Sequence, residues 1–262
     1  MRHCYVLSVF TRDGLGGNPL GVVTDVTGLD DAAMQAIAAD LAFSETVFLD
    51  WTSPGVPRAR IFTTVVEIPF AGHPLVGAAW VLGAMGPGTT RRMVCGIGEV
   101  PFRLDGASVF IEVPLPREVE PAPMAPVAGL PPAERAWLVR LPLRYLLLEA
   151  GSPGAVAGAH PDLAALAVAP WEGTLLFSRS GPVVKARFFC PALGVPDEDP
   201  ATGSAAVALA AALAHDGESA GAMTVDQGDE VGAPSRIEVV WGGGMVAVGG
   251  GVRRDEVRVL ER

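Results

Sequence analysis

Apolar and polar residues alternate over many short stretches of this chain, a period-two pattern that predicts β-strands. The 32 glycines and 23 prolines are spread throughout and separate these stretches by turns. Apolar residues take helical spacing only between Asp30 and Leu41, where Asp30 or Asp31 can cap an amphipathic helix. An alternating strand pattern follows over Phe43–Leu49. The chain is therefore predicted to be largely β, with few helices.

Two further helices are predicted to be buried, because their residues are small or apolar on nearly every face. They cover Gly72–Leu82 and Gly203–Leu213. Each follows a similar segment, Arg58–Phe62 in one half and Lys185–Phe189 in the other, and then a loop with acidic and proline residues. We interpret this echo as an internal duplication. A sheet wrapped around each helix is the simplest way to cover all of its faces.

The predicted fold class is α+β, with two similar domains. Each domain is expected to curl a mainly antiparallel or mixed, barrel-like β-sheet around one central α-helix. Prolines are dense between Pro114 and Pro132, which predicts an irregular inter-domain linker without regular structure. The boundary is placed near residue 118, which gives domains 1–117 and 118–262. The last strand is left free to pack on the first domain.

Charge and composition narrow the range of functions. The 29 acidic residues outnumber the 19 basic ones, and the net charge of −10 disfavours nucleic acid and anionic membranes as partners. The longest apolar run, Gly203–Ala214, is shorter than the roughly 20 residues of a membrane-spanning helix. Cys4, Cys95 and Cys190 lack the paired spacing of zinc sites or disulfides. With no signal-peptide pattern at the start, a cytoplasmic protein with buried, inert thiols is expected.

Two glycine-rich stretches, Gly242–Gly244 and Gly249–Gly251, could suggest phosphate loops. Neither has the Lys-Ser/Thr ending or the following helix of such a loop, so both are predicted to be hairpin turns. No group of His, Cys, Asp or Glu residues has metal-ligand spacing, and no metal is predicted.

Residues suited to chemistry gather in the segments Ser44–Thr46, Gly72–Pro74 and Glu198–Ser204. Two of these segments begin the predicted buried helices, whose free N–H groups and partial positive charge favour a bound carboxylate. A fourth segment adds amide and hydroxyl groups near residues 226–235. A small carboxylated substrate is expected to contact Gly72, Thr202, Gly203, Ser204, Gln227 and Ser235.

Glu45, His73 and Asp199 are the candidate catalytic residues. A buried carboxyl of raised pKa can lift a proton from one carbon and return it to another, so Glu45 can serve as base and acid. His73 is suited to stabilise charge or relay the proton, and Asp199 to orient an amino or hydroxyl group. Each also has a structural interpretation: Glu45 as a solvated strand residue, His73 in a helix start and Asp199 in a turn.

These segments, together with Gly17–Val23, resemble in order and spacing the PhzF-like family of phenazine biosynthesis. The resemblance covers about Val6 to Val239. It implies the fold shared by diaminopimelate epimerase and proline racemase. It also implies a homodimeric isomerase that uses no cofactor and has its active site in the cleft between the domains.

The same motif matching implies roles for single residues. Glu45 matches the proton shuttle of the family, and His73, Asp199 and Ser204 match residues that line the site. Gln227 is expected close by. The protein then moves a proton between carbons of a small carboxylated substrate.

Some positions depart from related proteins. The related epimerases use two cysteines at positions that hold Ala71 and Pro200 here, which disfavours a two-thiol racemase. Leu75 and Ala233 stand where the family usually has threonine and arginine, which suggests a different substrate or affinity. A racemase or epimerase, and a ligand- or protein-binding module without turnover, remain as alternatives.

Overall fold

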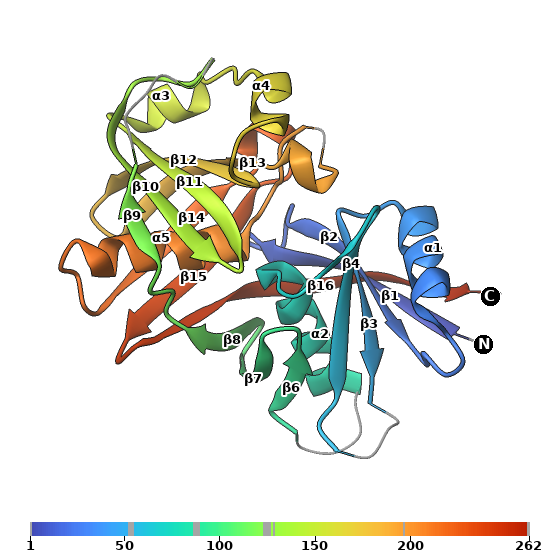
Figure 1. Cartoon of the computed structure of the whole chain (residues 1–262). Coiled ribbons are helices and arrows are strands. Elements are labelled where there is room, and N and C mark those ends of the chain that lie inside the picture. The colour runs from blue at the N-terminus through green and yellow to red at the C-terminus, as the bar shows by residue number, and fades with distance from the viewer. Residues whose placement is uncertain are drawn as a thin grey trace.

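The computed structural model describes residues 2–51, 55–85, 90–122, 127, 129–195 and 197–260. Over these residues one continuous sheet joins 16 strands, and it curls around two central helices, α2 (Gly72–Met85) and α5 (Gly203–His215) (Figure 1). This is the α+β architecture expected from the sequence. None of the helices in the described ranges is long and apolar enough to cross a membrane.

The first half of the chain curls around α2. Antiparallel and parallel pairs alternate over its first strands, and the helix Asp31–Leu41 packs outside on the strands Glu45–Asp50 and Arg58–Thr63. Its elements are β1 (Arg2–Thr11), β2 (Asn18–Thr24), α1 (Asp31–Leu41), β3 (Glu45–Asp50), β4 (Arg58–Thr63), β5 (Glu67–Ile68), α2 (Gly72–Met85), β6 (Arg92–Cys95), β7 (Gly98–Asp105) and β8 (Ser108–Pro114).

The second half curls around α5 in the same manner, with the short helices α3 and α4 outside. Its elements are β9 (Val119–Pro121), β10 (Ala133–Leu141), β11 (Leu143–Ala150), α3 (Pro153–Ala157), α4 (Leu163–Ala167), β12 (Gly173–Ser180), β13 (Val183–Phe189), the 3₁₀ turn η1 (Pro191–Leu193), α5 (Gly203–His215), β14 (Gly221–Gln227), the 3₁₀ turn η2 (Asp229–Val231), β15 (Ser235–Gly242) and β16 (Met245–Leu260).

The two halves repeat one pairing pattern. In the first, β1–β2 is antiparallel, β2–β3 parallel, β3–β4 antiparallel and β4–β6 parallel, after which β6, β7 and β8 are antiparallel. In the second, β10 to β16 follow the same sequence of pairings, with α5 between β13 and β14 as α2 lies between β4 and β6. The repeat expected from the sequence is therefore present in the topology.

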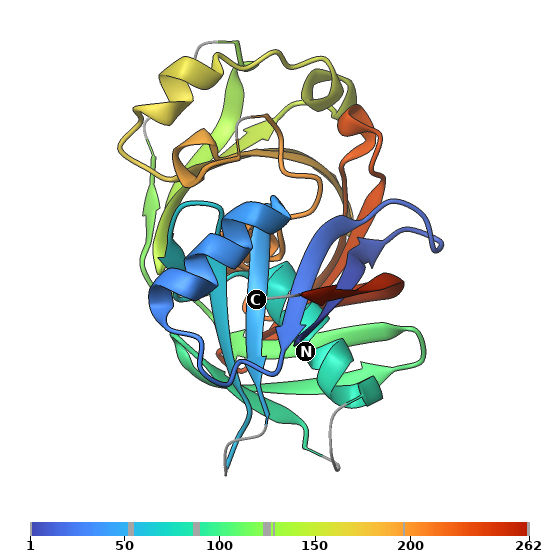
Figure 2. The ribbon, with the colours of Figure 1, turned by 90° about the vertical axis from the view of Figure 1, so that its right-hand side faces the viewer.

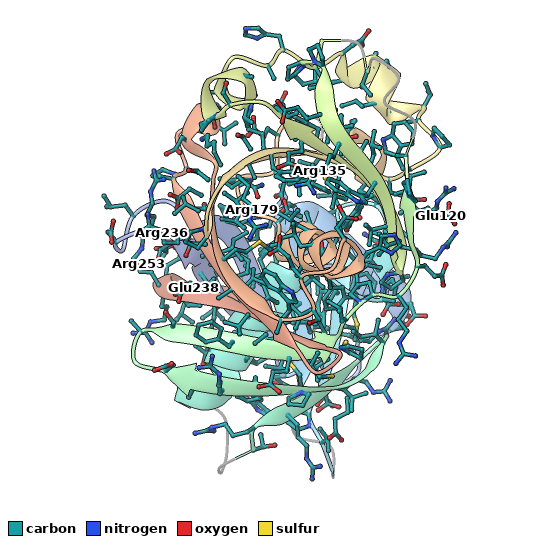
Figure 3. All side chains as sticks on the ribbon, turned by 90° about the vertical axis from the view of Figure 1, so that its left-hand side faces the viewer. Glu120, Arg135, Arg179, Arg236, Glu238 and Arg253 are labelled. Atoms are coloured by element: carbon teal, nitrogen blue, oxygen red, sulfur yellow. The ribbon has the colours of Figure 1, made fainter. Side chains whose placement is uncertain are left out.

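The predicted helices form where the sequence places them. Asp30 caps α1, since its side chain accepts a hydrogen bond of 2.8 Å from the backbone N–H of Ala33. In α5, every residue from Gly203 to Leu213 is buried. Figure 3 looks along this helix and shows the strands of the second half curving around it. Apolar residues on all faces are thus explained by a sheet that covers all faces.

The longest strand, β16, ties the halves together. It pairs with β15 of the second half and with β8 and β1 of the first half. Because Arg2 of β1 pairs with Leu260 of β16, the two termini lie side by side (Figures 1 and 2).

The hairpin predicted at Gly242–Gly244 is confirmed, but the turn predicted at Gly249–Gly251 is wrong. These three glycines lie inside β16, at the point where its partner changes from β15 to β1. A Cβ on Gly249 would lie 2.3 Å from the carbonyl oxygen of Val109, and one on Gly250 would lie 2.8 Å from that of Arg236. Glycine is required there by close backbone approach, not by a turn.

The prediction that Pro114–Pro132 lacks regular structure is also wrong in part. Val119–Pro121 forms β9, which pairs with Trp137–Val139 of β10. Because β9 is the last strand of the sheet, one of its edges needs no hydrogen-bonded neighbour and tolerates proline. Residues 123–126 and 128 of this stretch lie outside the described residues. The domain boundary near residue 118 stays a prediction.

Candidate functional site

The N-terminal ends of α2 and α5 meet between the two halves of the molecule. A Cβ on Gly72 would lie 2.7 Å from the Cα of Gly203, and one on Gly203 would lie 3.1 Å from the Cα of Gly72. Only glycine permits backbones to approach this closely. Two helix starts that abut combine their partial positive charges, which is an arrangement suited to binding a carboxylate.

Glu45 is the first residue of β3 and points to this junction. Its side chain is 16% exposed, and its Oε2 lies 3.7 Å from Nε2 of His73, the second residue of α2. Both atoms are buried, and neither has a hydrogen-bond partner among the described residues. Buried polar atoms are almost always paired in folded proteins, so two unpaired atoms facing each other mark a place where a ligand would supply the partner.

Burial sets the protonation of this pair. Burial raises the pKa of Glu45 to about 8, the negative charge of Asp199 adds to the rise, and a hydrogen bond with Ser44 opposes it. Burial lowers the pKa of His73 to about 3, although a hydrogen bond with the backbone of Pro19 partly opposes this. Near neutral pH, Glu45 therefore carries a proton and His73 is neutral.

Asp199 lies on the segment between β13 and α5, where its N–H bonds to the carbonyl of Phe188 at 3.0 Å. Its Oδ1 accepts a hydrogen bond of 2.8 Å from Asn18, and its Oδ2 accepts one from the hydroxyl of Thr202. Burial raises the pKa of Asp199 to about 6, and these two bonds lower it. The preceding residue, Glu198, is held by a buried ion pair of 2.7 Å with Arg187.

Gln227, at the end of β14, completes the support of this segment. Its Nε2 donates to the carbonyl of Asp199 at 2.6 Å and to the hydroxyl of Thr202 at 3.1 Å. Its Oε1 accepts from the backbone N–H of Thr202 at 3.3 Å. The side chain of Thr202 does not cap α5, because it is directed to Asp199 instead. Gln227 therefore satisfies the backbone N–H of the N-cap residue Thr202.

The structure brings most of the predicted residues together. Most of them lie around the junction of the two helices. They are Glu45, Gly72, His73, Asp199, Thr202, Gly203 and Gln227. Ser204 is also there, with its hydroxyl 3.1 Å from that of Tyr145. Ser235 pairs with Gln227 across β14 and β15, but its hydroxyl donates to the carbonyl of Ala233 at 2.8 Å. Its side chain thus stabilises the turn before β15.

Two residues near the junction were not among the predicted site residues. Asn18, 1% exposed, bonds to Asp199 and lies 3.4 Å from His73. Its signal was present, since Gly17–Val23 belongs to the pattern of the resemblance. Tyr145 lies on β11, where it reads as an ordinary strand residue, so its hydrogen bond to Ser204 had no signal in the sequence.

The described residues contain no group of three or more His, Cys, Asp or Glu side chains placed to hold a metal ion. All three cysteines are free and buried, as expected. Burial and the charges of Asp199 and Glu45 raise the pKa of Cys190 well above its usual value, which keeps this thiol protonated.

Comparison with solved structures shows that the chain has the diaminopimelate epimerase-like fold of PhzF-family proteins and proline racemases. A probable proline racemase of Agrobacterium radiobacter aligns with a TM-score of 0.67 and 10% identity, over 99% of this chain and 93% of that one. A PhzF-family protein of Enterococcus faecalis aligns with a TM-score of 0.83 and 23% identity, over 99% of both chains. At these identities the likeness concerns the fold alone.

The family follows from the sequence comparisons. The model of the phenazine biosynthesis-like (PhzC-PhzF) family matches residues 7–127 and 138–252, and the chain belongs to that family. A trans-2,3-dihydro-3-hydroxyanthranilate isomerase of Pseudomonas aeruginosa is 36% identical over 252 residues, 90% of this chain and 89% of the relative. An uncharacterized isomerase of Mesorhizobium japonicum is 36% identical over 282 residues, 91% and 90% of the two chains. The protein is thus an enzyme of the isomerase class.

Proposed function

We propose that this enzyme moves a proton between two carbons of a small carboxylated substrate through Glu45, without a cofactor. The observation that carries the proposal is the buried, unpartnered Oε2 of Glu45, which faces the unpartnered Nε2 of His73 at 3.7 Å. A general acid with a pKa near the working pH is the most effective, and the pKa of Glu45 is raised to about 8.

The proton transfer proceeds in two steps. Protonated Glu45 gives its proton to one substrate carbon, so an O–H bond breaks and a C–H bond forms. The resulting carboxylate then removes a proton from another carbon, which restores the acid while the double bond moves. Substrate carries positive charge between the steps, and the carboxylate of Asp199 stabilises it. His73 is held neutral by burial, and its Nε2, 3.7 Å from Oε2 of Glu45 and without a hydrogen-bond partner among the described residues, faces the place where the substrate would react.

The substrate carboxylate is placed at the starts of α2 and α5. The close contact of Gly72 and Gly203 brings both helix ends to one point, and the hydroxyl of Ser204 lies at the same end of α5. Gln227 holds the Asp199–Thr202 segment, so it acts on the substrate through that segment. The site lies between the two domains.

The first compound to test is trans-2,3-dihydro-3-hydroxyanthranilate, because relatives of three Pseudomonas species are named as isomerases of it. Leu75 and Ala233 favour a related carboxylate as the natural substrate. A panel of small amino and hydroxy carboxylates therefore accompanies it.

The experiment is NMR in deuterated buffer, with wild type and Glu45→Gln. Deuterium is expected at a substrate carbon with wild type but not with Glu45→Gln, which stays folded. Glu99→Gln is the control, since Glu99 lies exposed on β7 and pairs with Arg92. Full exchange by Glu45→Gln would overturn the proposal. Binding of the compounds to wild type without any exchange would instead point to a ligand-binding module.

A two-thiol racemase would need two cysteines at the site. Cys4 lies among the residues under α1, and Cys95 lies at the end of β6 beside Pro69 and Gly96. Cys190 is the cysteine near the site, since the charges of Asp199 and Glu45 contribute to the rise in its pKa. One thiol does not support this mechanism, and loss of activity on alkylation, prevented by substrate, would revive it.

The homodimer belongs to the same proposal. Light scattering of the purified protein is expected to give twice the chain mass of 27.1 kDa. A mass of one chain at micromolar concentration would contradict it.

A further inference from the structure

Asn18 is the single asparagine of the 262-residue chain, and it is 1% exposed at the centre of the site. It begins β2 in the first half of the molecule. Its side chain nevertheless bonds to the second half, with Nδ2 2.8 Å from Oδ1 of Asp199 and 2.9 Å from the carbonyl oxygen of Ala201. Its Oδ1 lies 3.5 Å from the hydroxyl of Ser44, the neighbour of Glu45.

The amide of Asn18 has two hydrogens, and these two short bonds use both of them. The third contact of Nδ2, 3.4 Å from Nδ1 of His73, therefore receives no hydrogen from Asn18. The backbone of Pro19 accepts a hydrogen bond from the imidazole, and Nε2 has no hydrogen-bond partner among the described residues, so we assign the proton of His73 to Nδ1. Nε2 is then the unprotonated nitrogen of His73, and its lone pair faces Glu45.

Asp199 differs from Glu45 in its hydrogen-bond donors. Each of its oxygens has a donor, Asn18 for one and Thr202 for the other. Hydrogen bonds to both oxygens stabilise the ionised form of a carboxyl. Oε2 of Glu45 has no such donor, and the negative charge of Asp199 further favours a proton on Glu45.

We propose that Asn18 is a positioning residue that decides where the single proton of this site resides. By holding Asp199 as the carboxylate, and by giving no hydrogen to Nδ1 of His73, it keeps the proton on Glu45. The inference rests on the proposed function, because it concerns the acid that acts there.

Other titratable groups near the pair do not compete for this proton. Tyr145 from β11 and Cys190 after β13 both have raised pKa values, mainly through burial, and stay neutral. Glu198 acts on Asp199 from the preceding position, but it is bonded to Arg187.

The test compares the pH dependence of kcat for wild type, Asn18→Leu and Thr202→Val. Activity of wild type is expected to fall as pH rises through about 8, where Glu45 loses its proton. In each variant Asp199 loses one donor, which raises the pKa of Asp199 above the wild-type value of about 6. The loss of activity on the acidic side of the profile, where Asp199 takes up a proton, should therefore move up by about one pH unit, a tenfold change in proton affinity, while the fall near pH 8 stays in place. Variants with lower kcat but an unchanged pH profile would show a merely structural role and overturn the inference.

A second readout uses wild type and does not depend on whether Asn18→Leu folds. Side-chain ¹⁵N labelling of asparagine gives one NH₂ group, because the chain has one asparagine. Its two proton signals are expected to shift as Asp199 titrates near pH 6, and Asp199→Asn should abolish this shift. Histidine ¹⁵N shifts should assign the proton of His73 to Nδ1, whereas a proton on Nε2 would overturn the inference.

The two proposals fail in different ways. Full activity of Glu45→Gln would remove the proposed function, whatever Asn18 does. An inactive Glu45→Gln combined with an unchanged pH profile in Asn18→Leu would remove only the role of Asn18.

Discussion

The two halves of this molecule share one topology but treat their polar groups differently where α2 and α5 begin. In the first half, Oε2 of Glu45 and Nε2 of His73 face each other without hydrogen-bond partners among the described residues. In the second half, Asp199 accepts bonds from Asn18 and Thr202, and Gln227 bonds to both Asp199 and Thr202. The polar groups of the first half can therefore bond to a ligand, whereas those of the second half already have hydrogen-bond partners within the protein.

This difference separates two carboxyls that are buried alike. Burial raises the pKa of both. The charge of Asp199 adds to the rise at Glu45, whose pKa reaches about 8, whereas two hydrogen-bond donors oppose the rise at Asp199, whose pKa is about 6. Environments that push two carboxyl pKa values apart assign the acid and the charge-stabilising role. A repeated backbone pattern can therefore support unlike halves of one site when the side-chain partners differ.

The largest expected effect is the loss of activity in Glu45→Gln, a change in the first half of the molecule. It removes the proton donor without changing side-chain size, so kcat should fall by about 10³-fold. The free energy of unfolding should not fall, because Oε2 has no hydrogen bond to lose. Steady-state kinetics and thermal unfolding of the same preparation check both statements. A clear loss of stability would mean that the carboxyl of Glu45 stabilises the fold through a bond within the protein.

Gly72→Ala tests the junction on which both halves depend. The new Cβ would meet backbone atoms of α5 at 2.7–2.8 Å, and backbone cannot move aside as a side chain can. The free energy of unfolding should fall by about 3 kcal/mol. Gly83→Ala in the same helix is the control, since the three atoms nearest to its Cβ all belong to the flexible side chain of Leu104. Urea denaturation measures both, and equal costs would argue against a tight junction.

Gln227→Leu tests the second half, where the polar groups have hydrogen-bond partners. It leaves the carbonyl of Asp199 and the N–H of Thr202 without partners, so the free energy of unfolding should fall by about 2 kcal/mol. The other glutamine of the chain, Gln35, donates to the carbonyl of Thr63 from α1 and is only partly buried. Gln35→Leu should cost less than about 1 kcal/mol. A reversed order would break the comparison between the halves.

The smallest expected effect is a dependence of stability on pH. Glu45 binds its proton more tightly in the folded state, with its pKa raised from 4.5 to about 8, so stability falls as pH rises through that range. His73 has the opposite effect, because its pKa is lowered from 6.5 to about 3 in the folded state. Its contribution raises the free energy of unfolding as pH rises from about 3 to 6.5 and is nearly constant above that. Between pH 6.5 and 8, the free energy of unfolding should fall on the order of 1 kcal/mol. Urea titrations at both pH values should show this fall in wild type but not in Glu45→Gln.

Elements with a strong local signal were predictable from the sequence. The sequence predicted the helices α1, α2 and α5, because the apolar residues and the capping or glycine residues of each helix lie within one short segment. The duplication was visible for the same reason. The site was predictable as a set of segments, and Glu45, His73 and Asp199 do lie around one junction.

Features that depend on distant partners were not predictable. Gly249–Gly251 looks like a turn until the crossing of β16 past Val109 and Arg236 is known. The edge strand β9 could not be seen in its proline-rich segment, because only its pairing with β10 creates it. Tyr145 joins the site through a neighbour 59 positions away.

By itself, the sequence determined the two apolar helices that begin with glycine, the strands around them and the acidic and imidazole groups next to the helix starts. These properties follow from local spacing and from side-chain chemistry. The tertiary structure alone decided which of those groups obtain hydrogen-bond partners. Asn18 and Asp199 are 181 positions apart, and only the packing of the two halves brings them within 2.8 Å. Proton affinity depends on burial and on such partners, so the unlike states of Glu45 and Asp199 emerge only in the folded chain.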